Sequence, residues 1–280
     1  MTQPTPDILV TTDWVLENAS RPDVRIVEVD TDTELYDKGH IPGALAWNWT
    51  TDLNDPVRRD IASREQFEAL LRKSGVTPDT TLVLYGDNNN WFAAFGVWLL
   101  NYYGHDRVKL LDGGRKRWEQ EGRPLVPEVP QVTPSTYAVR TERRELRATR
   151  DAVLEAAKAG RVGLVDVRSP DEYTGKILAP PGMSETALRG GHIPGAVNVP
   201  WAKAVKEDGT FRSLEELQQL YGKVAGRDDV ITYCRIGERS SHTWFVLHHL
   251  LGKERVRNYD GSWTEYGNLI GAPIRTGPEP

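Results

Sequence analysis

One short segment of the chain carries residue types suited to nucleophilic chemistry. Cys234 is the single cysteine among 280 residues, and it follows the apolar run Val230–Tyr233. That order predicts that the sulfur lies at the carboxyl end of a buried strand, which is where open α/β sheets bind ligands. The residues that complete the candidate loop are Arg235, Ile236, Gly237, Glu238, Arg239 and Ser240.

This loop is expected to stabilise an anionic sulfur. A tight strand-to-helix loop points backbone N–H groups toward one point, and the helix N-terminus adds partial positive charge. Arg235 and Arg239 set two full charges against that of Glu238, and Gly237 permits a positive φ. We therefore expect a lowered pKa for Cys234 and attraction of an anionic substrate. Most lone cysteines are simply small buried residues, but such a residue does not need this charged loop.

The elements that position this loop occur twice. Gly-His-Ile-Pro-Gly-Ala stands at residues 39–44 and again at 191–196, and residues 85–114 align without gaps on 233–262. Two matched blocks in the same order indicate a duplicated domain, and two copies of such long units exclude a solenoid.

Both copies predict the same α/β order. Strands are expected at 24–29, 81–85, 162–167 and 230–233, and helices at 92–103, 149–159 and 241–251. Ser63 and Ser213 have capping-box spacing to Gln66 and Glu216, which predicts a further helix in each copy. Alternating strands and helices imply a mainly parallel sheet with helices on both faces. We expect domains at 1–125 and 148–280, with a linker at 126–147 rich in proline and then in charge.

The copies differ where chemistry is expected. The second copy has about 14 extra residues within 174–190, before its repeated hexapeptide. In the first copy Gly86–Trp91 replaces the cysteine loop, so only the second copy has a nucleophile.

Composition narrows the class of protein. A net charge of −5 gives no reason to expect nucleic-acid binding. The longest apolar stretch, Trp91–Leu100, is too short to span a membrane, and Met1–Val10 does not read as a signal peptide. One cysteine makes neither an internal disulfide nor a multi-cysteine metal site, so we expect a cytoplasmic protein without a metal.

With these motifs the chain resembles the tandem-domain rhodaneses, and most closely the thiosulfate sulfurtransferases. The resemblance implies two rhodanese-like domains, an inactive first copy and a catalytic Cys234 in the second. It implies that the thiolate takes the outer sulfur of thiosulfate, releases sulfite and passes the sulfur from a persulfide to cyanide or a thiol. Arg239 would bind the sulfonate and Arg235 would assist, and no cofactor is required.

Four further residues are expected to support the site. Asp166 and Arg168 suggest a salt bridge beneath the loop, the alternative being a weak surface pair. His192 is expected to stabilise its turn, since His40 occupies the same place in the first copy. Trp201 is expected either to line the site or to pack in the core. Some family members carry a substrate-binding arginine shortly after the segment equivalent to 166–168. It is absent here, and Arg189 is expected to replace it.

The same residues are compatible with other functions. The same loop serves a 3-mercaptopyruvate sulfurtransferase or a carrier that passes persulfide to a protein acceptor, although two arginines favour the thiosulfate dianion. A cysteine-dependent phosphatase has five residues between cysteine and arginine, whereas four separate Cys234 from Arg239. A structural pseudoenzyme is disfavoured by the intact loop. The expected partners are an anionic sulfur donor and a thiophilic acceptor, without nucleic acid or membrane.

Overall fold

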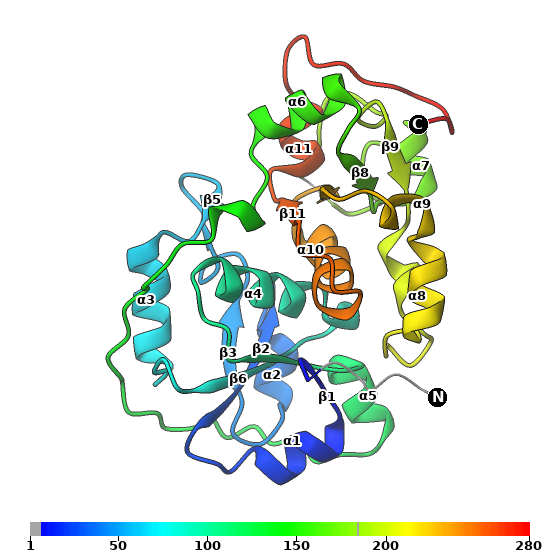
Figure 1. Cartoon of the computed structure of the whole chain (residues 1–280). Coiled ribbons are helices and arrows are strands. Elements are labelled where there is room, and N and C mark those ends of the chain that lie inside the picture. The colour runs from blue at the N-terminus through cyan, green and yellow to red at the C-terminus, as the bar shows by residue number, and fades with distance from the viewer. Residues whose placement is uncertain (1–6, 184) are drawn as a thin grey trace. The chain divides into compact units, whose positions relative to one another are not determined.

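The chain forms two compact units, each built around a parallel sheet (Figure 1). The computed structural model describes residues 7–183 and 185–280. The first unit extends to Arg143 and also takes in Val205–Phe211, and the second comprises Arg144–Ala204 and Arg212–Pro280. The fold class expected from the sequence is therefore confirmed.

The sheet of the first unit has the strand order β1-β7-β6-β2-β3, and all neighbouring strands are parallel. The strands are β1 (Leu9–Val10), β2 (Val24–Asp30), β3 (Leu45–Asn48), β6 (Thr81–Tyr85) and β7 (Val108–Leu111). A separate antiparallel pair is made by β4 (Asn54–Asp55) and β5 (Asp60–Ile61). The helical segments are α1 (Thr12–Asn18), α2 (Glu34–Lys38), α3 (Arg64–Lys73), η1 (Asn88–Asn90), α4 (Trp91–Tyr102) and α5 (Gly114–Gln120).

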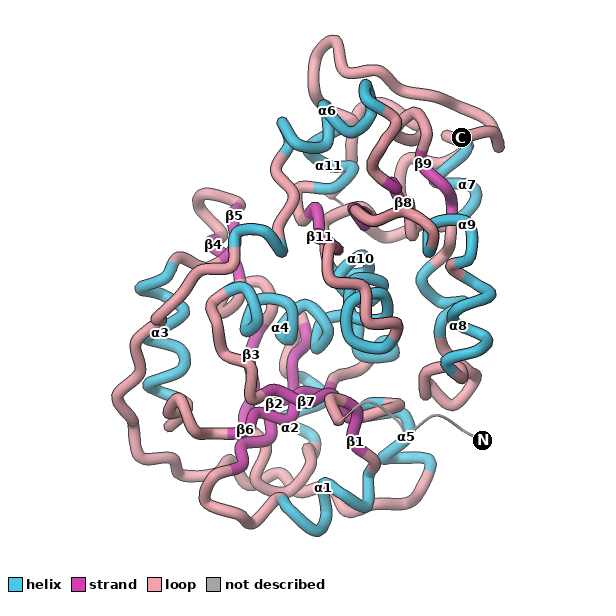
Figure 2. The backbone as a smooth tube through the Cα atoms, in the orientation of Figure 1, coloured by secondary structure: helices cyan, strands magenta, loops and turns pink. Residues whose placement is uncertain are grey.

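Helices cover both faces of this sheet because its central strands are apolar on both sides. Ile26 and Val83 point to one face, where they join a buried cluster that includes Val15 of α1 and Trp118 of α5. The apolar helix α4 contacts β2, β6 and β7 on the other face. Figure 2 shows α4 on one side of the magenta strands and α1 and α2 on the other.

The second unit repeats this layering with the parallel order β11-β10-β8-β9. Its strands are β8 (Gly163–Asp166), β9 (Ala196–Asn198), β10 (Val230–Tyr233) and β11 (Val256–Tyr259). Its helical segments are η2 (Arg144–Leu146), α6 (Arg150–Ala159), α7 (Pro170–Thr174), η3 (Trp201–Ala204), α8 (Leu214–Leu220), α9 (Gly222–Ala225), α10 (Glu238–Phe245), the π-helical η4 (Val246–Leu250) and α11 (Ser262–Tyr266).

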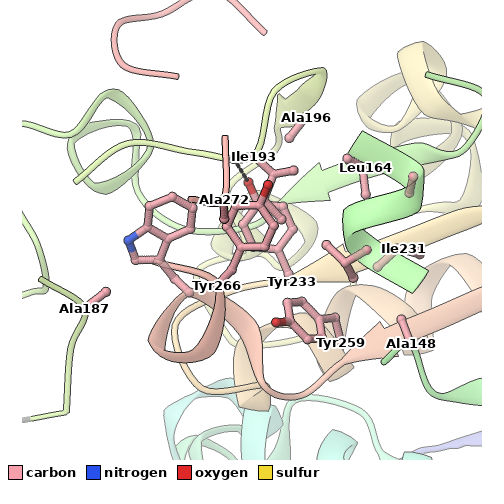
Figure 3. Close-up of a cluster of buried hydrophobic side chains, with 13 residues drawn as sticks. Ala148, Leu164, Ala187, Ile193, Ala196, Ile231, Tyr233, Tyr259, Tyr266 and Ala272 are labelled. Atoms are coloured by element: carbon pink, nitrogen blue, oxygen red, sulfur yellow. Dashed lines mark hydrogen bonds between the residues drawn. The ribbon is translucent and has the colours of Figure 1, made fainter. Parts of the chain in front are cut away.

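The core of the second unit lies between its sheet and two helices. Ile231 and Tyr233 of β10 pack with Val153 of α6 and with Trp263 and Tyr266 of α11. Figure 3 shows Tyr233 beside Ile193 of the repeated hexapeptide, with Tyr259 and Tyr266 in the same cluster. The Tyr233 hydroxyl accepts a hydrogen bond from the Ile193 N–H at 3.2 Å, so this buried polar atom has a partner.

Several local predictions are confirmed. The strands at 81–85 and 230–233 have the predicted ends. The capping boxes form as expected, since the side chains of Ser63 and Ser213 accept hydrogen bonds from the backbone N–H groups of Gln66 and Glu216. Thr149 caps α6, which ends at Gly160 in the left-handed conformation. The last apolar helix begins at residue 238 rather than 241, because Gly237 supplies the left-handed turn that starts it.

Part of the segment expected to be a linker packs against the first unit. The backbone carbonyls of Tyr137 and Val139 accept hydrogen bonds from Arg72 and Arg64 on α3. Val126 pairs with His40 of the repeated hexapeptide through two backbone hydrogen bonds.

No helix in the described part of the chain is long and apolar enough to cross a membrane.

Candidate active site

Cys234 lies where β10 ends and the chain turns into α10. Gly237 makes the turn with a φ of +100°, and a Cβ there would come within 2.7 Å of the Asp260 Cα. Glycine is therefore required at this position. The turn brings the Gly237 N–H to within 3.1 Å of the Cys234 Sγ, and this amide donates a hydrogen bond to the sulfur. The other end of the loop is fixed by the Cys234 N–H, which donates to the Ser262 Oγ at 3.0 Å.

The sulfur is fully buried beside a carboxylate. The Cys234 thiol donates a hydrogen bond to the Glu238 Oε2 at 3.2 Å, and Glu238 is itself buried. Burial and the Glu238 charge raise the pKa of Cys234, and the nearby Arg239 only partly opposes them. The expectation of a lowered pKa for Cys234 is therefore wrong for the thiol as the structure places it. In the sequence Glu238 is one of three charges in the loop, whereas in the structure its carboxylate contacts the thiol.

Arg239 forms a buried ion pair rather than pointing an open guanidinium at the sulfur. Its Nη1 and Nη2 donate to the two carboxylate oxygens of Glu172 on α7, at 3.1 and 3.0 Å. The Nε lies 3.5 Å from the Glu238 Oε1. Sequence reasoning missed Glu172. The visible clue was the spacing of Ser169 and Glu172, which form a capping box at the start of α7.

The inserted segment before the second hexapeptide supports the loop from outside. The Arg235 guanidinium donates to the Glu185 carbonyl in that segment, while the Arg235 carbonyl accepts from the Thr264 N–H and Oγ1. Arg189, from the same segment, donates to the carbonyls of Gly267, Leu269 and Ala272. These three contacts give Arg189 a structural role at the end of α11, which differs from the substrate contact expected for it.

The pair Asp166 and Arg168 is buried beneath the site and is not a surface pair. The Arg168 Nη2 lies 2.5 Å from the Asp166 Oδ2 and also donates to the Gly191 carbonyl at 2.7 Å. The guanidinium carbon lies 4.5 Å from the centre of the Trp263 ring, in cation–π geometry. This pair therefore links the end of β8 to the repeated hexapeptide and to α11.

His192 has the same contacts as His40 in the other copy. It stacks on Tyr173 with ring centres 3.7 Å apart, and its two nitrogens hydrogen-bond to the carbonyls of Tyr173 and Glu279. His40 stacks on Tyr36 at the same distance. Both ring nitrogens of His192 are thus engaged by backbone, as a turn-stabilising residue requires.

The remaining predicted site residues pack around the loop. The Ser240 Oγ lies 3.0 Å from the Gly237 carbonyl oxygen and 2.6 Å from the Asn258 Oδ1, and Ile236 is buried. Trp201 meets His242 edge to face, with ring centres 5.4 Å apart.

The equivalent loop of the first unit is built without a nucleophile. Asn88, Asn89 and Asn90 all have positive φ angles, and the Asn90 side chain accepts from the Gly86 N–H and donates to the Leu111 carbonyl. Burial and the neighbouring Asp87 raise the pKa of Asp30 to about 10. Side-chain amides and carboxyls therefore line this end of the sheet.

His242 on α10 should make the stability of the protein depend on pH. Burial lowers the pKa of His242 to about 3, against an ordinary value of 6.5. Between these values the unfolded chain binds one more proton, so the free energy of unfolding should fall as the pH falls below about 6.5, by about 1.4 kcal/mol per pH unit. Urea unfolding at several pH values measures this slope, and His242→Gln should remove it. The same change at the half-buried His248 is the control, and equal slopes in all three proteins would contradict the assignment.

Known proteins resemble the chain over almost all of its length. The model of the rhodanese-like domain matches residues 11–121 and 149–269. A putative thiosulfate sulfurtransferase of Mycolicibacterium smegmatis is 55% identical over 274 residues, which cover 97% of this chain and 98% of that protein. The sulfur carrier protein TtuD of Thermus thermophilus is 54% identical over 280 residues, which cover 98% of each. A solved structure of EanB with a cysteine persulfide and ergothioneine has a TM-score of 0.84 at 25% identity, and covers 96% of this chain and 70% of its own.

Proposed function

We propose that this chain, which belongs to the rhodanese family and has relatives named as sulfurtransferases, transfers the outer sulfur of thiosulfate to a thiophilic acceptor. The sulfur is carried as a persulfide on Cys234. The second unit is the catalytic copy in this proposal, and the first is inactive. The observation that carries it is the single cysteine, held at the carboxyl end of β10 with the Gly237 N–H on its sulfur.

The reaction has two steps at one sulfur atom. The Cys234 thiolate attacks the outer sulfur of thiosulfate, the bond to the sulfonate sulfur breaks, and sulfite leaves with the electron pair. Cyanide or a thiol then attacks the outer sulfur of the persulfide, and Cys234 is regenerated. The Gly237 N–H, which already contacts Sγ, is placed to stabilise negative charge on the sulfur during both steps.

Arg235 and Arg239 have different parts in this proposal. Because Arg239 is paired with Glu172, it holds the helix that follows the loop and acts on the sulfur through its charge. Arg235 is the remaining loop cation for the donor anion. The proposal of thiosulfate rather than 3-mercaptopyruvate as the donor therefore rests on the charge of Arg235 and on the names of the relatives. A free thiol suits the reducing cytoplasm, which is the compartment we propose.

The first test is the intact mass of the purified protein before thiosulfate, after it, and after a later addition of cyanide. We expect a gain of one sulfur atom on Cys234, and its removal by cyanide as thiocyanate. 3-Mercaptopyruvate is the matched donor control. If only this compound loads sulfur onto Cys234, the donor is 3-mercaptopyruvate and not thiosulfate. Absence of a mass gain with either donor would contradict the proposal.

A second candidate function is that of a persulfide carrier. The 54% identity to the sulfur carrier protein TtuD favours it. A carrier and a cyanide-using enzyme load sulfur in the same way but differ in turnover. With excess thiosulfate and cyanide, an enzyme should release thiocyanate over many cycles. A carrier should load once and release thiocyanate slowly even at high thiosulfate, and it should pass its sulfur on when a protein acceptor is supplied.

A further inference from the structure

The contact between Cys234 and Glu238 brings a proton donor and a proton acceptor together inside the protein. The Sγ and the Glu238 Oε2 are 3.2 Å apart, and both residues are almost completely buried. The other carboxylate oxygen, Oε1, faces the Arg239 Nε at 3.5 Å. Arg239 is in turn held by Glu172, so the Glu238 side chain is fixed in place with one oxygen on the sulfur.

We propose that Glu238 is the catalytic base that takes the thiol proton of Cys234, keeps it while the sulfur is a persulfide, and returns it when the acceptor leaves. This role rests on the proposed function, because it assigns a proton to each step of the persulfide cycle. Glu238 touches the reacting sulfur and therefore takes part in the chemistry directly.

The proton balance follows from the two half-reactions. In the first, the S–H proton moves to Oε2, the thiolate forms a bond to the outer sulfur of thiosulfate, and sulfite leaves with the electron pair of the broken S–S bond. The persulfide then carries one negative charge beside a neutral Glu238. In the second, cyanide binds the outer sulfur, the S–S electron pair returns to Sγ, and the proton on Oε2 returns to the thiolate.

Charge explains why a carboxylate suits this position. The pair carries one negative charge as thiol and carboxylate, and still one as thiolate and carboxylic acid. Loss of the proton to water would instead leave two anions together in a buried site, which is costly. The structure supports this reasoning, since burial and the Glu238 charge both raise the pKa of the thiol.

The other charged groups around the sulfur have hydrogen-bond partners other than the thiol. Arg239 and Glu172 bind each other, and Arg235 donates to the Glu185 carbonyl. Asp260, at the end of β11 against Gly237, is paired with Arg147 by two hydrogen bonds of 2.7 Å. The Ser262 Oγ lies 3.9 Å from the sulfur and donates to the Tyr259 carbonyl, and the Ser240 hydroxyl acts to lower the pKa of the thiol. Glu238 is the carboxylate that the structure places in hydrogen-bond contact with the thiol.

The test is the pH dependence of Cys234 reactivity in the wild-type chain and in Glu238→Gln. Two probes are used, namely alkylation by iodoacetamide and sulfur loading by thiosulfate, both followed by intact mass. In the wild type the thiol proton moves to Glu238 and not to water, so the reactive form keeps the same number of protons and both rates should be nearly flat between about pH 6 and about pH 8. In Glu238→Gln the thiol titrates alone, so both rates should rise about tenfold per pH unit up to its pKa. Glu215→Gln, an exposed change on α8, should keep the flat profile.

The two probes separate this proposal from the proposed function. If the alkylation profile is flat for the wild type and steep for Glu238→Gln, but thiosulfate loads no sulfur, the proton transfer is supported. The assignment of thiosulfate as the sulfur donor is then overturned. Parallel profiles for the two proteins would overturn the role of Glu238, even if both load sulfur. If Glu238→Gln does not fold, Glu238→Asp carries the test. Its shorter side chain should lower the plateau rate about tenfold, and an unchanged rate would refute the proposal.

Discussion

Cys234→Ser should abolish sulfur transfer and leave the fold intact. The loss should exceed about 10³-fold, because a serine hydroxyl at this position neither ionises near neutral pH nor forms a persulfide. The fold should be unaffected because the side chains are nearly the same size. The hydroxyl can still accept from the Gly237 N–H and donate to Glu238.

The measurements are the rate of thiocyanate release, intact mass after thiosulfate, and urea unfolding. Wild-type protein alkylated by iodoacetamide is the matched control, since the chain has no second cysteine for the reagent to modify. It should be as inactive as the serine variant. If the serine variant keeps more than about a tenth of wild-type turnover, Cys234 is not the nucleophile.

The fold could be predicted from sequence wherever local pattern and tertiary packing agree. The strands at 81–85 and 230–233 are apolar runs with clear ends, and the helices after Ser63 and Ser213 begin at capping boxes. The two-residue strands β1, β4 and β5 have no period that a sequence can show.

One assignment depends entirely on contacts distant in sequence. Val205–Phe211 falls inside the second copy by sequence but belongs to the first compact unit. There Asp208 pairs with Arg117, and the Phe211 N–H donates to Asp112. No local propensity encodes such pairings.

The candidate site likewise contains features that the local sequence predicts and features that depend on distant contacts. The position of Cys234 followed from the strand before it and the loop after it. The partner of Arg239 did not, because Glu172 lies 67 residues away in sequence. The predicted direction of the Cys234 pKa shift was wrong for a geometric reason. A carboxylate four residues from a thiol can point toward it or away, and the charge count alone does not distinguish these cases.

Glu172→Gln should destabilise the protein by about 3–5 kcal/mol, because it leaves the guanidinium of Arg239 buried without its counter-charge. Both side chains are at most 5% exposed. Although burial alone would raise the pKa of Glu172, the hydrogen bonds and charge of Arg239 outweigh it, and the pKa lies below its ordinary value of 4.5. The stabilisation should therefore be complete above about pH 4.5 and be lost as the pH falls through the folded-state pKa.

The chain contains a matched control for this prediction. Glu216 on α8 also closes a capping box and also pairs with an arginine, Arg212, at 3.0 Å, but both of these side chains are at least 40% exposed. Urea unfolding should therefore show a loss of less than about 1 kcal/mol for Glu216→Gln. The double variant Glu172→Gln with Arg239→Met should recover much of the stability lost in Glu172→Gln, because it removes both buried charges. Equal losses at Glu172 and Glu216 would mean that the capping box, and not the buried ion pair, stabilises α7. A large difference between them would identify the Glu172–Arg239 pair as the link that holds α7 to the helix bearing Glu238.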